Sequence, residues 1–183
     1  SGPALSMVLR SRGIAMESVS APKQTETTQR WKIGLSVEGN AIPLHTKIEF
    51  SRRPTMEESR VEPIAASVLA EHQLMAFLAP HYPLAAAQRQ KVEALAGRRV
   101  VQARDVFDLG VLFARSGAEV DALESVRPVL PKAIERAMDV SYADFKSQVA
   151  SYLRPDHLDT YGSREAWDAL QTQVVDLLQK ALS

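Results

Sequence analysis

The chain has 183 residues, about the length of one domain, and its 45% hydrophobic and 24% charged residues match an ordinary globular protein. Because 22 basic residues balance 22 acidic ones, the composition excludes a histone-like or tail-like role and leaves anion binding to a local cluster. The absence of cysteine excludes disulfides, a thiolate nucleophile and cysteine-ligated metals. The apolar stretches are far shorter than the roughly 18 residues that cross a bilayer, so we expect a cytoplasmic protein with no membrane partner.

The first segment with a clear pattern is a helix over residues 4–12, where good helix formers place apolar residues on one face. Gly13 is placed to end this helix. Residues 18–28 come soon after and are rich in Ser, Thr, Pro and Gln, a composition typical of a surface loop.

Residues 29–51 are predicted to form an antiparallel β-hairpin, because apolar and polar side chains alternate on both sides of a turn at Gly39-Asn40. In this register Arg30 lies opposite Glu49, and the apolar residues of both strands share one face. The apolar set, which we expect to be buried against helices, is Trp31, Ile33, Leu35, Ile48 and Phe50. The polar set, which either meets water or lines a cleft, is Lys32, His45, Lys47 and Glu49.

Beyond Arg53-Pro54 the pattern becomes helical, the stretch 74–82 included, and no strand signal returns strongly. We therefore expect about five or six helices, with Ser141 and Ser163 placed to cap the helix after Ser141 and the final one. The helix after Ser141 has one stripe of large side chains: Tyr142, Phe145, Val149, Tyr152 and Leu153.

These segments together predict an α+β protein, in which a small antiparallel sheet precedes a helical bundle. We expect two domains. Residues 1–60 would hold the first helix and the hairpin, and residues 61–183 would form the helical domain. The common catalytic motifs do not occur: the four histidines lack the spacing of a helical zinc site, and there is no Gly-x-Ser-x-Gly, Walker or Gly-x-Gly-x-x-Gly sequence.

Residues 88–112 are the most informative segment and are predicted to form two helices joined by a short link. Lys91 projects from a mostly apolar face of the first helix. On the second helix, Asp105 and Asp108 lie three residues apart on an apolar-flanked face. Because a lone buried charge is costly, Lys91 needs an anion, which is either one of these carboxylates or a bound phosphate. From the residues alone, the internal ion pair is the commoner outcome.

The run KVEALAGRRVVQARDVFDL, residues 91–109, resembles the C-terminal signature of the AbiEii/AbiGii type IV toxin family. In that signature a Lys-x-x-Ala-Leu helix is followed by an Arg-Asp-x-x-Asp-Leu helix. The resemblance extends to TKIEFSRR on the hairpin, to DFKSQVASYL and to the helix of Trp167. It implies a nucleotidyltransferase of the polymerase-beta-like superfamily that transfers nucleotides from a nucleoside triphosphate to an RNA acceptor such as tRNA. The implied partners are a winged-helix antitoxin and tRNA, without DNA.

The chain also departs from the family pattern, because the Gly-rich turn and the Asp-x-Asp strand that holds Mg²⁺ in the family do not occur. The resemblance therefore begins just after that strand. We expect the chain to be a C-terminal portion of the enzyme, made of a remnant of the nucleotidyltransferase sheet and the helical domain. We also expect it to be inactive alone and to bind Mg²⁺ poorly. The alternative is a degenerate, non-catalytic relative that acts as a protein-binding or RNA-binding module.

The resemblance assigns site residues one by one. Lys91 matches the lysine that contacts the triphosphate, Asp105 matches the acid of the Arg-Asp motif, and both are therefore candidate catalytic residues. Arg104 and Lys47 are the further candidates for nucleotide binding, although Asp108 could instead orient Arg104 through an i, i+4 pair.

Glu49 lies where the superfamily places a third catalytic acid, so it is the one candidate for a metal ligand. The alternative is a plain cross-strand pair with Arg30. We further expect Lys91 and Asp105 to converge on one cleft beside Glu49, because the short link makes their helices antiparallel neighbours.

Overall fold

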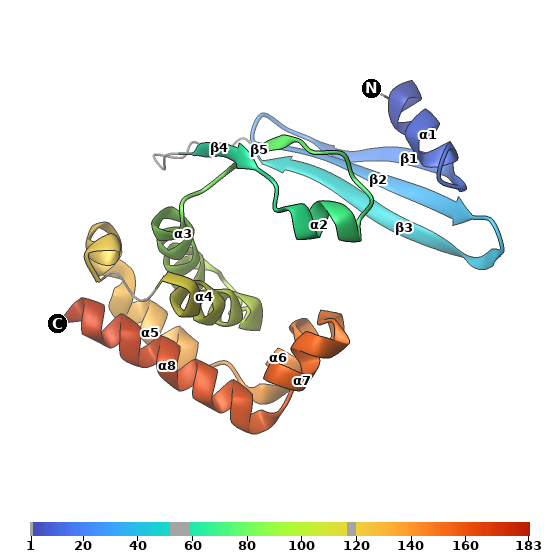
Figure 1. Ribbon diagram of the computed structural model, residues 1–183. Coiled ribbons are helices and arrows are strands. Elements are labelled where there is room, and N and C mark those ends of the chain that lie inside the picture. The colour runs from blue at the N-terminus through green and yellow to red at the C-terminus, as the bar shows by residue number, and fades with distance from the viewer. Residues whose placement is uncertain (1, 52–58, 117–119) are drawn as a thin grey trace. The chain divides into compact units, whose positions relative to one another are not determined.

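The computed structural model describes residues 2–51, 59–116 and 120–183, and the chain divides into two units, Ser1–Met56 and Glu57–Ser183. Each unit contains an antiparallel sheet; among the described residues, the first unit has one helix and the second has several (Figure 1). The predicted α+β class is confirmed. No helix in the described ranges is both long and apolar enough to cross a membrane.

The N-terminal unit is a three-stranded antiparallel sheet preceded by one helix, α1 (Gly2–Arg10). The strands are β1 (Ile14–Gln24), β2 (Thr28–Val37) and β3 (Asn40–Ser51), in the spatial order β1-β2-β3. Gly13 ends α1 as expected, since its φ of 69° allows a reversal that other residues resist.

The loop predicted over residues 18–28 is wrong, because most of this segment belongs to β1. The register of β1 against β2 shifts twice, between Met16 and Ser18 and between Ser20 and Lys23. Each shift interrupts the two-residue alternation that marks a strand in a sequence. The strand is therefore present in the structure but carries no regular pattern.

The register predicted for the hairpin is confirmed, with Arg30 opposite Glu49. Its turn lies one residue earlier than predicted, at Glu38 and Gly39, since Val37 already pairs with Asn40. A register shift next to this turn explains how the turn can lie one residue earlier while Arg30 still lies opposite Glu49. It spans Pro43, which has no N–H to donate to the ladder, and Gly39 supplies the φ of 80° that a tight turn needs.

The expected burial of the apolar hairpin face is only partly correct. Ile33 is buried and Trp31 and Leu35 are half-buried, but Ile48 and Phe50 are exposed. The alternation in the sequence specifies which side chains share a face of the sheet, but not how completely other elements cover that face. Ile48 and Phe50 are exposed because they belong to β3, an edge strand whose residues are all exposed.

The C-terminal unit begins with a two-stranded antiparallel sheet, β4 (Arg60–Pro63) paired with β5 (Leu78–His81), with α2 (Ala66–Glu71) between the strands. The helix predicted over residues 74–82 is therefore wrong. Pro80 lies in that stretch and cannot continue a helix, whereas it is tolerated in an edge strand.

Two helices carry the segment singled out from the sequence, α3 (Leu84–Gly97) and α4 (Ala103–Ser116), as predicted. The remaining elements are η1 (Val120–Val129), α5 (Leu130–Met138), α6 (Tyr142–Gln148), η2 (Ala150–Tyr152), α7 (Pro155–Tyr161) and α8 (Arg164–Leu182). Figure 1 shows α8, in red, running alongside α5.

The core of the C-terminal unit lies between these helices. Its largest member is Trp167 of α8, which stacks on Phe145 of α6 at a ring distance of 4.5 Å. Both predicted caps are confirmed, since Ser141 forms a capping box with Asp144 and the Ser163 hydroxyl accepts from the backbone of α8. Tyr152 departs from the predicted stripe: α6 ends at Gln148, and Tyr152 itself is 81% exposed.

Candidate functional site

The candidate site is built around Asp105 at the start of α4. The backbone N–H of Ala103 donates to the side-chain oxygen of Gln148 on α6 at 2.8 Å, so a neighbouring helix caps α4. Asp105 lies in the first turn, where a negative charge is favoured by the helix dipole, and its side chain is fully buried.

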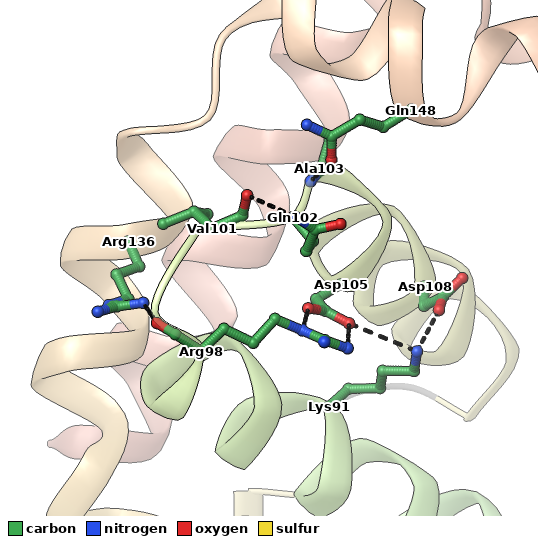
Figure 2. Close-up of polar contacts among 9 residues, drawn as sticks. All are labelled: Lys91, Arg98, Val101, Gln102, Ala103, Asp105, Asp108, Arg136 and Gln148. Carbon is green, nitrogen blue, oxygen red and sulfur yellow. Dashed lines mark hydrogen bonds and ion pairs between the residues drawn. The ribbon is translucent and has the colours of Figure 1, made fainter. Parts of the chain in front are cut away.

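Arg98 partners Asp105 from the link between α3 and α4. Its Nε donates to Oδ2 at 2.5 Å and its Nη2 to Oδ1 at 3.3 Å, which makes a two-pronged guanidinium–carboxylate contact. The guanidinium of Arg136 on α5 donates to the backbone carbonyl of Arg98, as Figure 2 shows. Arg98 is thus held at both its backbone and its side chain.

Lys91 reaches the same carboxylate from α3. Its Nζ forms an ion pair with Asp108 and lies 3.6 Å from Oδ1 of Asp105 (Figure 2). The Lys91 side chain is 31% exposed and that of Asp108 is 40% exposed, whereas Asp105 has no exposure. The Lys91 side chain is therefore partly exposed at the rim of the cluster, and its amine lies between a buried and a half-exposed carboxylate.

The charges of this cluster do not cancel. Lys91, Arg98 and Arg136 are cationic, and only Asp105 and Asp108 are anionic, which leaves one positive charge in excess. The excess charge belongs to Arg136, which contacts the backbone of Arg98, whereas the two cations and two carboxylates around the Lys91 amine balance one another.

The predicted convergence of Lys91 and Asp105 is confirmed, in the form of the internal ion pair. Asp108 pairs with Lys91 and not with Arg104, which has no ion-pair partner among the described residues. Glu49 belongs to the other unit, so the expectation that it lies beside this cluster stays a prediction.

Sequence reasoning missed Arg98, Arg136 and Gln148. Arg98 lies in a link that has no periodicity, and the bonds that Arg136 and Gln148 make are to backbone atoms distant in the chain. The one available signal was the pair of arginines, Arg98 and Arg99, directly between the two helices.

The site residues of the N-terminal unit lie on the polar face of its sheet. Nε of Arg30 donates to Oε2 of Glu49 at 2.8 Å, so the plain cross-strand pair is present, and this hydrogen bond lowers the pKa of Glu49 below its ordinary value. Lys47 lies directly opposite Lys32, beside a hollow of about 650 Å³ that both lysines and His45 help to line. Like charges placed opposite each other repel, and an anion between them would relieve the repulsion.

The residues present do not assemble a magnesium site. No three His, Asp or Glu side chains gather as a metal-binding group in the described ranges, and the carboxylate of Glu49 is engaged by Arg30. Mg²⁺ needs several oxygen ligands in octahedral geometry, which one paired carboxylate cannot provide. We therefore derive no chemical step through a metal.

Comparison with known proteins gives a family and a fold. A family model described as nucleotidyl transferase AbiEii toxin, type IV TA system, matches residues 3–181. The fold is similar to that of JHP933 from Helicobacter pylori, with a TM-score of 0.53 and 15% identity over 93% of this chain. It is also similar to that of a candidate nucleotidyltransferase from H. pylori, with a TM-score of 0.52 and 14% identity over 93% of this chain.

The chain spans 65% of the length of JHP933 and 67% of the second structure. No curated protein matches the chain significantly. At these identities the two solved structures speak for the fold alone.

Proposed function

Because the chain belongs to the AbiEii nucleotidyl transferase toxin family of type IV toxin–antitoxin systems, we propose that it is the C-terminal portion of an enzyme that transfers nucleotides to RNA. The donor would be a nucleoside triphosphate and the acceptor an RNA such as tRNA. The observation that carries this proposal is the cluster at Lys91, where a partly exposed lysine side chain reaches the buried carboxylate of Asp105.

Lys91 would hold the triphosphate. An ammonium group has three N–H donors, so Lys91 can keep its contact with Asp108 and still donate to a phosphate oxygen. Its side chain is partly exposed, which leaves room for such a ligand. In the transfer, an acceptor hydroxyl oxygen bonds to the α-phosphorus and loses its proton to solvent, the bond from the α-phosphorus to the bridging oxygen breaks, and pyrophosphate leaves.

Asp105 would act as a positioning residue. Its carboxylate is fully buried and is bound by Arg98 on one side and approached by Lys91 on the other, so it cannot touch a ligand at the rim. Its charge instead fixes where the amine of Lys91 points. Arg104, which has no ion-pair partner among the described residues, would provide a further contact to phosphate.

The N-terminal unit would contribute Lys47 to nucleotide binding, and Glu49, which is paired with Arg30 in this chain, would be one carboxylate of the metal site of the complete enzyme. The repulsion between Lys47 and Lys32 supports an anion at this face. Mg²⁺ and the nucleoside triphosphate belong to the proposal for the whole enzyme, and we propose that this chain alone binds little of either.

The type IV family implies an antitoxin partner. We propose that this antitoxin is of the winged-helix type, that tRNA is the nucleic acid involved, and that the protein acts in the cytoplasm without a membrane or DNA partner.

A second candidate is a non-catalytic relative that binds RNA or protein. One observation favours it: the carboxylates that surround Lys91 already pair with it, so the cluster is stable without a ligand. In that case the Lys91 cluster would stabilise the fold and would bind no ligand.

The test measures transfer of radiolabel from nucleoside triphosphates to total tRNA. It compares the 183-residue chain with a version in which any upstream reading frame is restored. We expect transfer by the extended protein and none by the shorter chain. Transfer by neither protein would favour the binding module, and magnesium-dependent transfer by the 183-residue chain would contradict the expected inactivity.

A further inference from the structure

A second hollow lies next to the Lys91 cluster, between α4 and the segment formed by α6 and η2. Its volume is about 530 Å³, within the range of small-ligand sites. Asp108 is part of its wall and also the partner of Lys91. The hollow therefore begins where the Lys91 cluster ends.

Tyr152 of η2 supplies an aromatic surface to this hollow. Tyr152 is 81% exposed, more than any other aromatic residue in the described part of the chain. An aromatic ring left in water forgoes the stabilisation that burial would give it. The flat face of such a ring is where an unstacked nucleic-acid base binds.

Arg104 of α4 supplies the positive charge. It is exposed, it lines the hollow, and no ion pair joins it to any described residue, because Asp108, one turn further along, is engaged by Lys91. A guanidinium group is suited to phosphate oxygens, which it can contact through two N–H groups. Since one guanidinium stands unpaired, it matches the single charge of a phosphodiester better than the several charges of a triphosphate.

The remaining lining fits a nucleotide. Phe107 gives an apolar floor and is held in place by an edge-on contact with Tyr161 at 5.3 Å. The hydroxyl of Ser147 donates to the backbone carbonyl of Asp144 and leaves its oxygen to accept a hydrogen bond.

We propose that this hollow binds a nucleotide of single-stranded RNA, with its base stacked on Tyr152 and its phosphate on Arg104. This inference rests on the proposed function, since it places the end of the RNA acceptor beside the amine that would hold the triphosphate. A single strand is required because a base within a duplex has no free face for the tyrosine ring.

The test measures binding of a fluorescently labelled RNA hexamer to the whole 183-residue chain by anisotropy. Tyr152→Ala is expected to weaken binding roughly 5- to 150-fold, the range for loss of one stacked base, while Tyr152→Phe stays within about twofold of the original. Arg104→Gln is expected to lower the slope of log affinity against log salt by about 0.7. The matched controls, Tyr82→Ala and Arg115→Gln, change residues outside the hollow and should leave binding unchanged.

Two results would overturn the inference. One is equal binding by Tyr152→Ala and the original chain, with both shown to be folded by circular dichroism. The other is displacement of the hexamer by nucleoside triphosphate that itself depends on Tyr152, which would make the hollow a triphosphate site. RNA binding is measured without catalysis, so the two proposals can fail separately. If the extended protein transfers nucleotides normally and Tyr152→Ala binds RNA as well as the original chain, this inference is wrong and the proposed function stands.

Discussion

At the scale of single residues, Asp105 and Asp108 differ in burial although they contact the same amine. Asp105 is fully buried and accepts two hydrogen bonds from Arg98, whereas the Asp108 side chain is 40% exposed. If the ion pair with Lys91 is lost, water can solvate the exposed carboxylate of Asp108. Water cannot replace Arg98 as the partner of the buried carboxylate of Asp105.

We therefore expect Asp105→Asn to lower the free energy of unfolding by about 1.5 to 3 kcal/mol, the contribution of hydrogen bonds to a charged group. Asp108→Asn, which is the matched control, should cost about 0 to 1 kcal/mol. Urea denaturation followed by circular dichroism measures both. Equal costs for the two variants would contradict the difference in burial.

Glu49 gives a prediction about pH. The hydrogen bond from Arg30 lowers the pKa of Glu49 below its ordinary value of 4.5. The ion pair between Glu49 and Arg30 therefore stabilises the folded chain above pH 4.5, and this stabilisation is lost as the pH falls through the lowered pKa. In Arg30→Gln the pKa of Glu49 should rise toward 4.5. A titration followed by NMR measures it, and an unchanged pKa in the variant would show that Arg30 is not the cause.

The residues of the site were only partly predictable from the sequence. Helical periodicity and the cost of a lone buried charge predicted that Lys91 and Asp105 lie close together. The structure places the two side chains in an ion pair. Arg98 was not predictable, because a residue in a link has no periodicity to reveal its direction.

At the scale of elements, long and regular patterns predicted the structure and interrupted ones did not. The register of β2 and β3 away from their turn was predictable, because the alternation there is regular, and the start of α8 was predictable from its cap, Ser163. β1 was missed because two register shifts break its alternation, and β5 because a short apolar run containing Pro80 gives little periodic signal.

The start of α4 depends on a cap from another helix. Gln148→Ala removes the acceptor for the N–H of Ala103 and should cost about 0.5 to 2 kcal/mol, as other N-terminal caps do. Hydrogen exchange at the amide of Ala103 should become faster. The control is Gln173→Ala on the exposed face of α8, and an equal effect of both variants would argue against the cap.

At the scale of the whole molecule, equal numbers of basic and acidic residues conceal an uneven distribution. Basic side chains gather locally, at Arg98 and Arg136 in one unit and at the facing lysines Lys32 and Lys47 in the other. A neutral chain with two such clusters can bind anions at chosen places without binding polyanions over its whole surface.

On the proposed function, Lys91 serves a phosphate and does more than complete an ion pair. Lys91→Met in the extended protein tests it most directly, with transfer to tRNA and the free energy of unfolding measured on the same preparation and Lys180→Met as the control. We predict a loss of transfer of about 100-fold or more while the free energy of unfolding stays within about 1 kcal/mol, since Asp105 keeps Arg98 and Asp108 meets water. Retained transfer, or a loss of roughly 3 to 5 kcal/mol in stability, would contradict the claim and make Lys91 part of the fold alone.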